Sequence, residues 1–224
     1  MEPSPAEPPA GVSARFWALL RAERLKDAAV LDVGTGSGRL ALALAPHCAS
    51  VVGIDRDADA IAEATRRARA GYLRNADFLV LDAEAPEDYR ALVGEGRGPD
   101  LVTAHLCVSD RIIESAGRSL APGQALALVA FHVDQWRETG RRSRFAYDEE
   151  RIGRALEAAG LAAEHVEVER EVRHFDSVEA ALAAAIGLQE RWKTDGRWFH
   201  YVRFLEEGGR TLTRSHLLVK ARKR

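Results

Sequence analysis

The chain alternates short unbroken apolar runs with segments in which apolar residues recur every three or four positions. Unbroken runs are typical of strands buried on both faces of a parallel sheet, and the recurring pattern is typical of helices that lay one face on it. The expected strands are 29–33, 50–55, 77–81, 99–104 and 125–131, and the expected helices are 12–26, 39–45, 58–70, 86–93, 110–119 and 148–159. This alternation predicts a doubly wound, Rossmann-like α/β fold with helices on both faces.

The last part of the chain has a different pattern. Segments 165–175 and 212–221 alternate polar and apolar residues, as longer strands do, and they flank a helical insert at about 176–210. At the other end, four of the first ten residues are proline, so residues 1–11 are expected to form a disordered tail. We therefore expect a single domain over residues 12–224 that carries one helical insert.

Composition narrows the range of functions. The 224 residues are 46% hydrophobic and 29% charged with a net charge of -2, so a long-range attraction for phosphate backbones is missing and nucleic-acid binding is disfavoured. Two basic segments, 137–144 and 220–224, leave an RNA-binding alternative open. No apolar run approaches the ~20 residues of a membrane span, so no membrane association is expected.

The two cysteines, Cys48 and Cys107, lack the spacing of a disulfide framework or a zinc site. We expect reduced thiols and no bound metal, in a cytoplasmic monomer or homodimer whose partner is a small-molecule substrate. Function must then be sought at the carboxyl ends of the strands, where open α/β sheets bind their ligands.

A glycine-rich turn follows the first strand. Glycines at 34, 36 and 38 allow a ligand to approach the backbone closely, because the missing Cβ atoms remove steric bulk. The spacing differs from the dinucleotide fingerprint, since Arg39 stands where its third glycine would be, and this disfavours hydride-transfer enzymes.

Acidic residues mark the ends of three strands or turns. Asp32 is a carboxylate in an otherwise apolar strand, and burying it is costly unless a ligand ammonium or the polar groups of the turn compensate its charge. It serves either as a ligand contact or as an internal brace for the turn. Asp55 closes the second strand and Asp82 follows the third, where each could accept hydrogen bonds from a ligand or cap the next helix.

These residues carry a family resemblance. VLDVGTGSGRLALALA and VVGIDRDADAI resemble the first two motifs of the class I S-adenosylmethionine-dependent methyltransferases, close to the small-molecule, type 11 branch, and FLVLDAEA is similar to the third. The resemblance implies a seven-stranded sheet of order 3-2-1-4-5-7-6, with strand 7 antiparallel and the insert as a partial lid. It implies S-adenosylmethionine as cofactor.

The same resemblance assigns a cofactor contact to each motif residue. Gly34, Thr35, Gly36 and Gly38 would pass under the methionine part, with Asp32 near its amino end. Asp55, with Arg56 beside it, would bind the ribose hydroxyls, and Asp82 and Ala83 would bind the adenine, while Ala104 ends the fourth strand at the same edge.

Methyl transfer is an in-line displacement, and an oxygen or nitrogen acceptor that must lose a proton needs a base. His105, after the fourth strand, is the first candidate and His132, after the fifth, is the second. Either can also be a structural histidine. AHLCVSD lacks the Asn-Pro-Pro-aromatic signature, which argues against methylation of DNA or glutamine amino groups. Aromatic residues of the insert could line an apolar acceptor site or form a core: Trp192, Trp198, Phe199, Tyr201 and Phe204.

The sequence predicts methyl transfer to an oxygen, nitrogen or carbon atom of a small molecule. Alternatives are an RNA methyltransferase and a protein that binds S-adenosylmethionine without catalysis. Aminopropyl transfer is disfavoured, because His105, Leu106 and Cys107 stand where that chemistry uses further acids.

Overall fold

The computed structural model describes residues 7–93 and 96–224, which form two compact units. The first unit runs to Ala130 and includes Glu150–Val166 and Leu218–Arg224, and the second consists of Phe131–Glu149 and Glu167–Leu217. Of the tail expected at residues 1–11, residues 1–6 lie outside the described part. A turn follows, in which the Val12 N–H donates to the Pro9 carbonyl at 2.9 Å.

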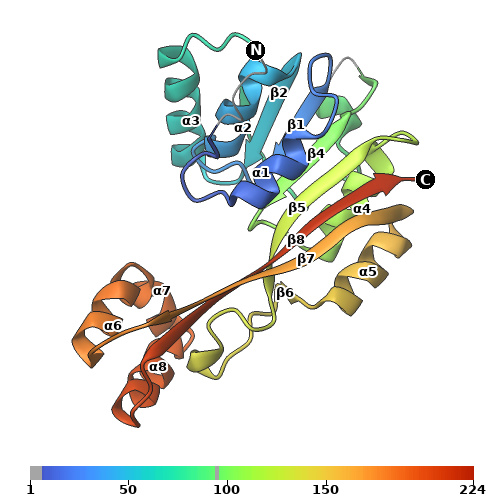
Figure 1. Cartoon of the computed structure of the whole chain (residues 1–224). Helices are drawn as coiled ribbons and strands as arrows, with labels where there is room; N and C mark the ends of the chain where they lie inside the picture. Colours follow the sequence, from blue (N-terminus) through green and yellow to red (C-terminus); the bar gives the residue numbers. More distant parts are fainter. Residues whose placement is uncertain (1–6, 94–95) are drawn as a thin grey trace, which may run out of the picture. The chain divides into compact units, whose positions relative to one another are not determined.

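One sheet runs through the structure in the order β3-β2-β1-β4-β5-β8-β7 (Figure 1). Its strands are β1 (Ala29–Val33), β2 (Ser50–Asp55), β3 (Ala76–Val80), β4 (Leu101–His105), β5 (Ala125–His132), β6 (Ala146–Tyr147), β7 (Leu161–His174) and β8 (Thr211–Lys223). The predicted order is confirmed, because the sixth and seventh predicted strands are β7 and β8. The two-residue β6, which pairs with β5, makes the sheet eight-stranded instead of seven-stranded.

The orientation of β8 follows from its hydrogen bonds. The Gly123 N–H donates to the Lys223 carbonyl, and the Lys223 N–H donates to the Gln124 carbonyl, both at 2.9 Å. The end of β8 therefore meets the start of β5, which makes the pair antiparallel, as predicted. The pairs among β1 to β5 are all parallel.

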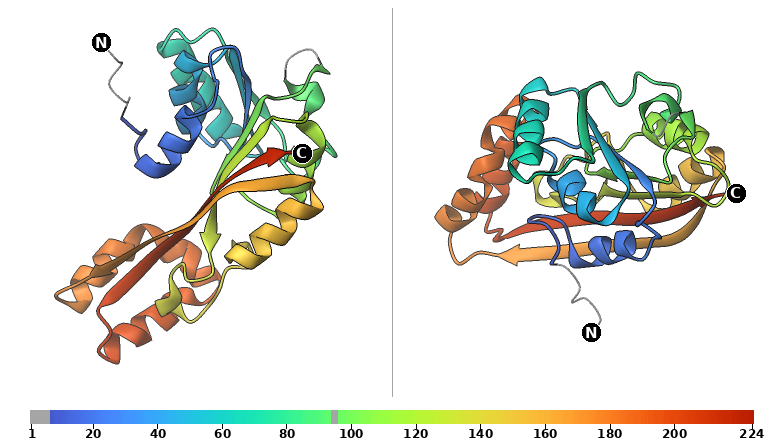
Figure 2. Two further views of the ribbon diagram at one scale, coloured as in Figure 1. Left: turned by 45° about the vertical axis from the view of Figure 1, so that its right-hand side comes forward. Right: turned by 90° about the horizontal axis from the view of Figure 1, so that it is seen from above.

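Helices connect the strands. They are α1 (Ala14–Arg21), α2 (Arg39–Leu44), α3 (Ala58–Ala70), α4 (Asp110–Ser119), α5 (Glu149–Ala158), α6 (Val178–Ala185), α7 (Gln189–Thr194) and α8 (Arg197–Glu206). Side chains cap the first turns of α1, α3, α4 and α6, and the capping residues are Ser13, Asp57, Ser109 and Ser177. Within the first unit, α1 lies on one face of the sheet and α4 on the other (Figure 2). Among the described helices, none is both long and apolar enough to cross a membrane.

The helix predicted at 86–93 is wrong, because only a 3-10 turn, Arg90–Leu92, forms there. The Tyr89 N–H donates to Ser119 Oγ at 2.7 Å, and the Tyr89 hydroxyl donates to the Ala83 carbonyl at 2.8 Å. The Tyr89 N–H thus bonds to a distant side chain instead of to a carbonyl of a helix.

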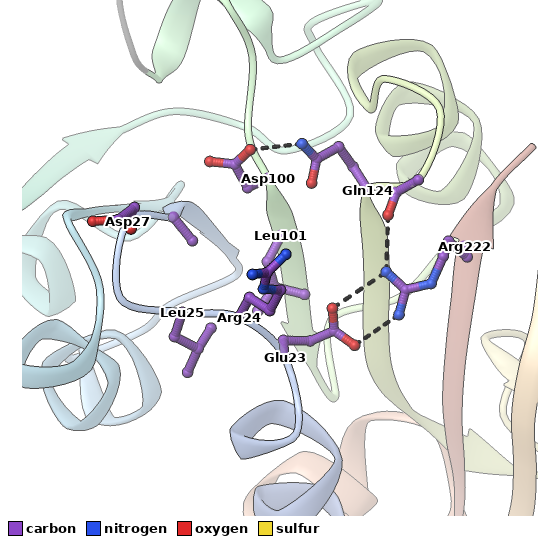
Figure 3. Close-up of a pocket in the computed structure, with 10 residues that line it drawn as sticks. Glu23, Arg24, Leu25, Asp27, Asp100, Leu101, Gln124 and Arg222 are labelled. Carbon is purple, nitrogen blue, oxygen red and sulfur yellow. Dashed lines mark hydrogen bonds and ion pairs between the residues drawn. The ribbon is translucent and has the colours of Figure 1, made fainter.

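An ion-pair network joins the segment after α1 to the last strand, β8, at the amino ends of the parallel strands. Glu23 and Glu164 both pair with Arg222 and Lys220, and the Arg222 guanidinium also donates to the Gly123 carbonyl at 2.8 Å. The network borders a cavity of about 460 Å³, on whose far side Asp100 accepts from Gln124 (Figure 3). Burial raises the pKa of Glu23, but hydrogen bonds from Arg222 and Lys220 outweigh it and hold the pKa below its ordinary value.

We expect Arg222→Gln to lower the free energy of unfolding by about 1–2 kcal/mol, because the partly buried Glu23 and the exposed Glu164 both lose their bidentate partner. Glu23 ionises more readily in the folded state, so the loss should be full at neutral pH and shrink as pH falls through the lowered pKa. Urea unfolding at pH 7 and pH 4 measures it. Arg214→Gln, which breaks an exposed 3.9 Å pair with Glu171, is the control and should change stability little. Equal effects of the two variants would contradict a structural role for the network.

Candidate functional site

The glycine-rich turn connects β1 to α2 at the carboxyl edge of the sheet. Gly34, Gly36 and Gly38 have φ of 68°, 54° and 78°, a left-handed conformation that favours glycine. A Cβ on Gly34 would lie 2.2 Å from the Cys107 Cβ, whereas a Cβ on Gly36 would meet nothing within 4 Å. The turn is therefore closely packed at its first glycine and open at its second.

Asp32, near the end of β1, is hydrogen-bonded to this turn. Its side chain is 1% exposed, and it accepts hydrogen bonds from Thr35 Oγ1 at 2.7 Å and Thr103 Oγ1 at 2.8 Å. The β1–β4 register places Thr103 directly opposite Asp32. The geometry matches the brace interpretation of Asp32. Burial raises the pKa of this carboxyl to about 6, although the two threonine hydroxyls act to lower it.

Asp55 reaches the turn from the end of β2. One carboxylate oxygen accepts from the Gly36 N–H at 2.9 Å and the other accepts from the Asp57 N–H at 3.0 Å. Its neighbour Arg56 is exposed. The two strand ends thus meet at Gly36, beside the open side of the turn.

The third motif continues along the same edge. The Leu81 N–H donates to the Asp55 carbonyl at 2.9 Å, which keeps the segment after β3 next to β2. Asp82 Oδ1 accepts from the Glu84 N–H at 3.0 Å, and Ala83 is buried with its carbonyl bonded to Tyr89. Ala104, near the end of β4, is fully buried.

A pocket of about 780 Å³ opens beside the turn. Its described lining comprises Pro9, Ala10, Gly34, Thr35, Gly36, Ser37, Arg39, Leu42 and Arg67. Arg39 lines the pocket, and one of its guanidinium nitrogens donates to the Ala10 carbonyl at 3.1 Å while the other donates to His105 Nδ1 at 3.3 Å. His105 also packs against the Phe16 ring, with centroids 5.9 Å apart.

His132 lies in the second unit and is 5% exposed. Its Nδ1 lies 3.1 Å from Ser215 Oγ and accepts from the Asp134 N–H at 3.3 Å, while Nε2 lies 3.6 Å from a Glu149 carboxylate oxygen. These bonds integrate the imidazole into the interior of its unit.

The aromatic residues of the insert form the apolar core of the second unit. Trp192 and Tyr201 are fully buried, and the Trp192 ring meets Trp136 and Tyr201 edge-on, with centroids 5.2 and 5.6 Å apart. Trp198 and Phe204 pack against this cluster, and Phe199 is 66% exposed.

Sequence reasoning missed Thr103, Cys107 and Arg67 as parts of this edge. Thr103 and Cys107 belong to β4 and the turn after it, about 70 residues from the glycine turn, and only strand pairing brings them there. Arg67 lies on α3 and donates to the Ser37 carbonyl at 3.3 Å. A helical arginine carries no signal that separates it from a solvated charge.

The raised pKa of Asp32 predicts a pH-dependent stability. Between about pH 4 and 6 the unfolded chain has lost the Asp32 proton and the folded chain retains it, so rising pH favours unfolding. Relative to Asp32→Asn, the wild type should lose about 2 kcal/mol of unfolding free energy from pH 4 to pH 7. Urea titrations of both proteins across this range measure the difference, and parallel pH profiles would contradict the assignment.

Comparison with known proteins places this chain in a family. A profile described as "Methyltransferase domain" matches residues 25–207. An S-adenosylmethionine-dependent methyltransferase from Mesorhizobium loti shares 19% identity and a TM-score of 0.60, with 94% of this chain and 99% of that chain covered. Magnesium protoporphyrin IX methyltransferase from Synechocystis PCC 6803, solved with S-adenosylhomocysteine, shares 15% identity and a TM-score of 0.61 over 94% and 80% of the two chains.

The [4+2]-cyclase SpnF is also similar, at 25% identity and a TM-score of 0.61 over 91% of this chain and 78% of that chain. A search of curated proteins found no match. The two methyltransferase structures, at low identity, support the fold, and the family profile spans most of the sequence. The chain therefore belongs to the methyltransferase-domain family, and its fold is that of S-adenosylmethionine-dependent methyltransferases.

Proposed function

We propose that this protein methylates an oxygen, nitrogen or carbon nucleophile of a small-molecule acceptor, with the cofactor in the pocket beside the glycine turn. The observation that carries the proposal is the meeting of the two strand ends at Gly36. There the Asp55 carboxylate lies 2.9 Å from the Gly36 N–H, and the open side of Gly36 lines the 780 Å³ pocket.

The residues present fit S-adenosylmethionine. A cradle without Cβ atoms suits a ligand that lies against the backbone, and the Asp55 carboxylate suits ribose hydroxyls, because it only accepts hydrogen bonds. Asp82 and Ala83 follow β3 at the same edge and suit the adenine. The buried carboxylate of Asp32 lies next to the turn, and its negative charge favours a cationic ligand there.

When bound, S-adenosylmethionine supplies a methyl group on a positively charged sulfur. The chain then has to orient the acceptor in line with that group and exclude water, and orientation can lower a barrier by ~7–11 kcal/mol. Of the two predicted bases, His105 contacts a residue that lines the pocket, Arg39. Because the Arg39 guanidinium can only donate, the neutral His105 ring carries its proton on Nε2, and Nδ1 takes up a proton only after Arg39 leaves it.

The alternatives to small-molecule methylation are a different reaction and an RNA substrate. Similarity to the [4+2]-cyclase SpnF favours, as a second candidate, a cyclisation reaction on the same fold instead of methyl transfer. An RNA substrate is less well supported, because Lys220 and Arg222 are paired with Glu23 and Glu164 and so present less positive charge.

Isothermal titration with S-adenosylmethionine, S-adenosylhomocysteine and NADH tests the proposal. We expect micromolar binding of the first two and a loss of about tenfold or more in Asp55→Ala, since the ribose hydroxyls lose their acceptor. Asp57→Ala is the matched control, because Asp57 caps α3 through Asp59 and Ala60 and should affect stability alone, by about 1 kcal/mol. Binding of NADH instead of the sulfur compounds would overturn the proposal.

Two alanine substitutions in the turn should have opposite profiles. Gly34→Ala places a methyl group on Cys107 and should cost about 3 kcal/mol of stability. Gly36→Ala meets open space, should cost only ~1–2 kcal/mol for its left-handed backbone, and should weaken cofactor binding by narrowing the pocket. Thermal unfolding and titration measure both quantities. A folded Gly36→Ala variant with wild-type affinity would place the cofactor elsewhere.

A further inference from the structure

Two arginines line the pocket beside the glycine turn, and the cofactor contacts described above use neither. Arg39 begins α2 and Arg67 lies on α3, and both side chains are exposed. Among the described residues that line the pocket, none is acidic. The lining therefore carries two positive charges that are not balanced within it.

Arg39 interacts with the buried Asp32 carboxyl only through longer-range electrostatics, and its hydrogen-bond partners are neutral. Within residues 7–93 and 96–224, its hydrogen-bond partners are the Ala10 carbonyl and His105 Nδ1, which are neutral acceptors at 3.1 and 3.3 Å. Arg67 is partly compensated, with its Nε 3.5 Å from a Glu63 carboxylate oxygen and its Nη1 bonded to Ser37 at the pocket wall. A planar guanidinium that donates only to neutral acceptors in a pocket lining is suited to bind a carboxylate through two parallel hydrogen bonds.

We propose that Arg39, supported by Arg67, forms a carboxylate-binding subsite in this pocket. The inference rests on the proposed function, because it assumes that the pocket takes the cofactor and its acceptor. A carboxylate would replace the exposed Ala10 carbonyl as the partner of Arg39 and would gain a charge-assisted bond. Two ligands could supply it: the methionine part of the cofactor, or an acceptor that carries a carboxylate.

Decarboxylated S-adenosylmethionine separates these two sources, because it differs from S-adenosylmethionine only by the carboxylate. If the cofactor supplies the group, the wild type should bind the decarboxylated compound about tenfold more weakly. Arg39→Gln should then bind both compounds with the same, weaker affinity. Arg39→Lys should fall between, since it keeps the charge and loses the planar fork.

If the acceptor supplies the group, Arg39→Gln should bind S-adenosylhomocysteine as the wild type does. With that compound saturating, the wild type should then bind benzoate, and Arg39→Gln should bind it at least about tenfold more weakly. Arg67→Gln should weaken the same ligand by a smaller factor. Arg66→Gln is the control, because Arg66 lies next to Arg67 on α3, also pairs with Glu63 and is outside the pocket lining.

The subsite is disproved if Arg39→Gln binds S-adenosylmethionine, its decarboxylated form and benzoate as the wild type does, or if the wild type binds both cofactor forms equally and does not bind benzoate. A wild type that binds neither S-adenosylmethionine nor S-adenosylhomocysteine would instead refute the proposed function. Circular dichroism of each variant confirms that a lost affinity does not reflect unfolding.

Discussion

The hydrogen bonds of Asp32 to Thr35 and Thr103 are the constraint on which the site depends. A buried carboxylate is costly, and its raised pKa shows that the cost is only partly relieved. The two bonds join the glycine turn after β1 to β4. A shift of the turn would therefore leave the buried Asp32 carboxylate with fewer hydrogen bonds. The two bonds thus fix the position of the glycine turn relative to β4.

The turn after β4 is fixed against the same cradle. Leu106 has a φ of 62°, which is unfavourable for a branched residue, and Cys107 then packs on Gly34 at a distance that excludes any side chain there. His105 on the other side of Leu106 meets Arg39, which lines the pocket. The left-handed conformation of Leu106 thus places Cys107 against Gly34 and His105 against Arg39.

A partly buried hydrogen-bond cluster around Glu138 stabilises the second unit. Glu138, nearly buried, accepts from the Thr213 N–H at 3.0 Å and from the Thr211 hydroxyl at 3.3 Å, which ties the 3-10 turn Arg137–Thr139 to β8. Burial and the Glu138 charge raise the pKa of Tyr201 to about 12, so this tyrosine remains a neutral core residue. The prediction that the insert acts as a lid remains a prediction.

The sequence by itself determined the elements whose signals are local. β1, β2, α3 and α4 lie at the predicted residues, because apolar periodicity, a capping Asp57 or Ser109 and a glycine turn act within a few residues. Family resemblance added the sheet order and the cofactor. Only the tertiary structure decided the rest: Tyr89 gives its N–H to Ser119 instead of a helix, Thr103 shares the charge of Asp32, and Arg39 meets His105. Those contacts join residues about 30 to 70 positions apart, and local patterns hold no information on which distant strands will pair.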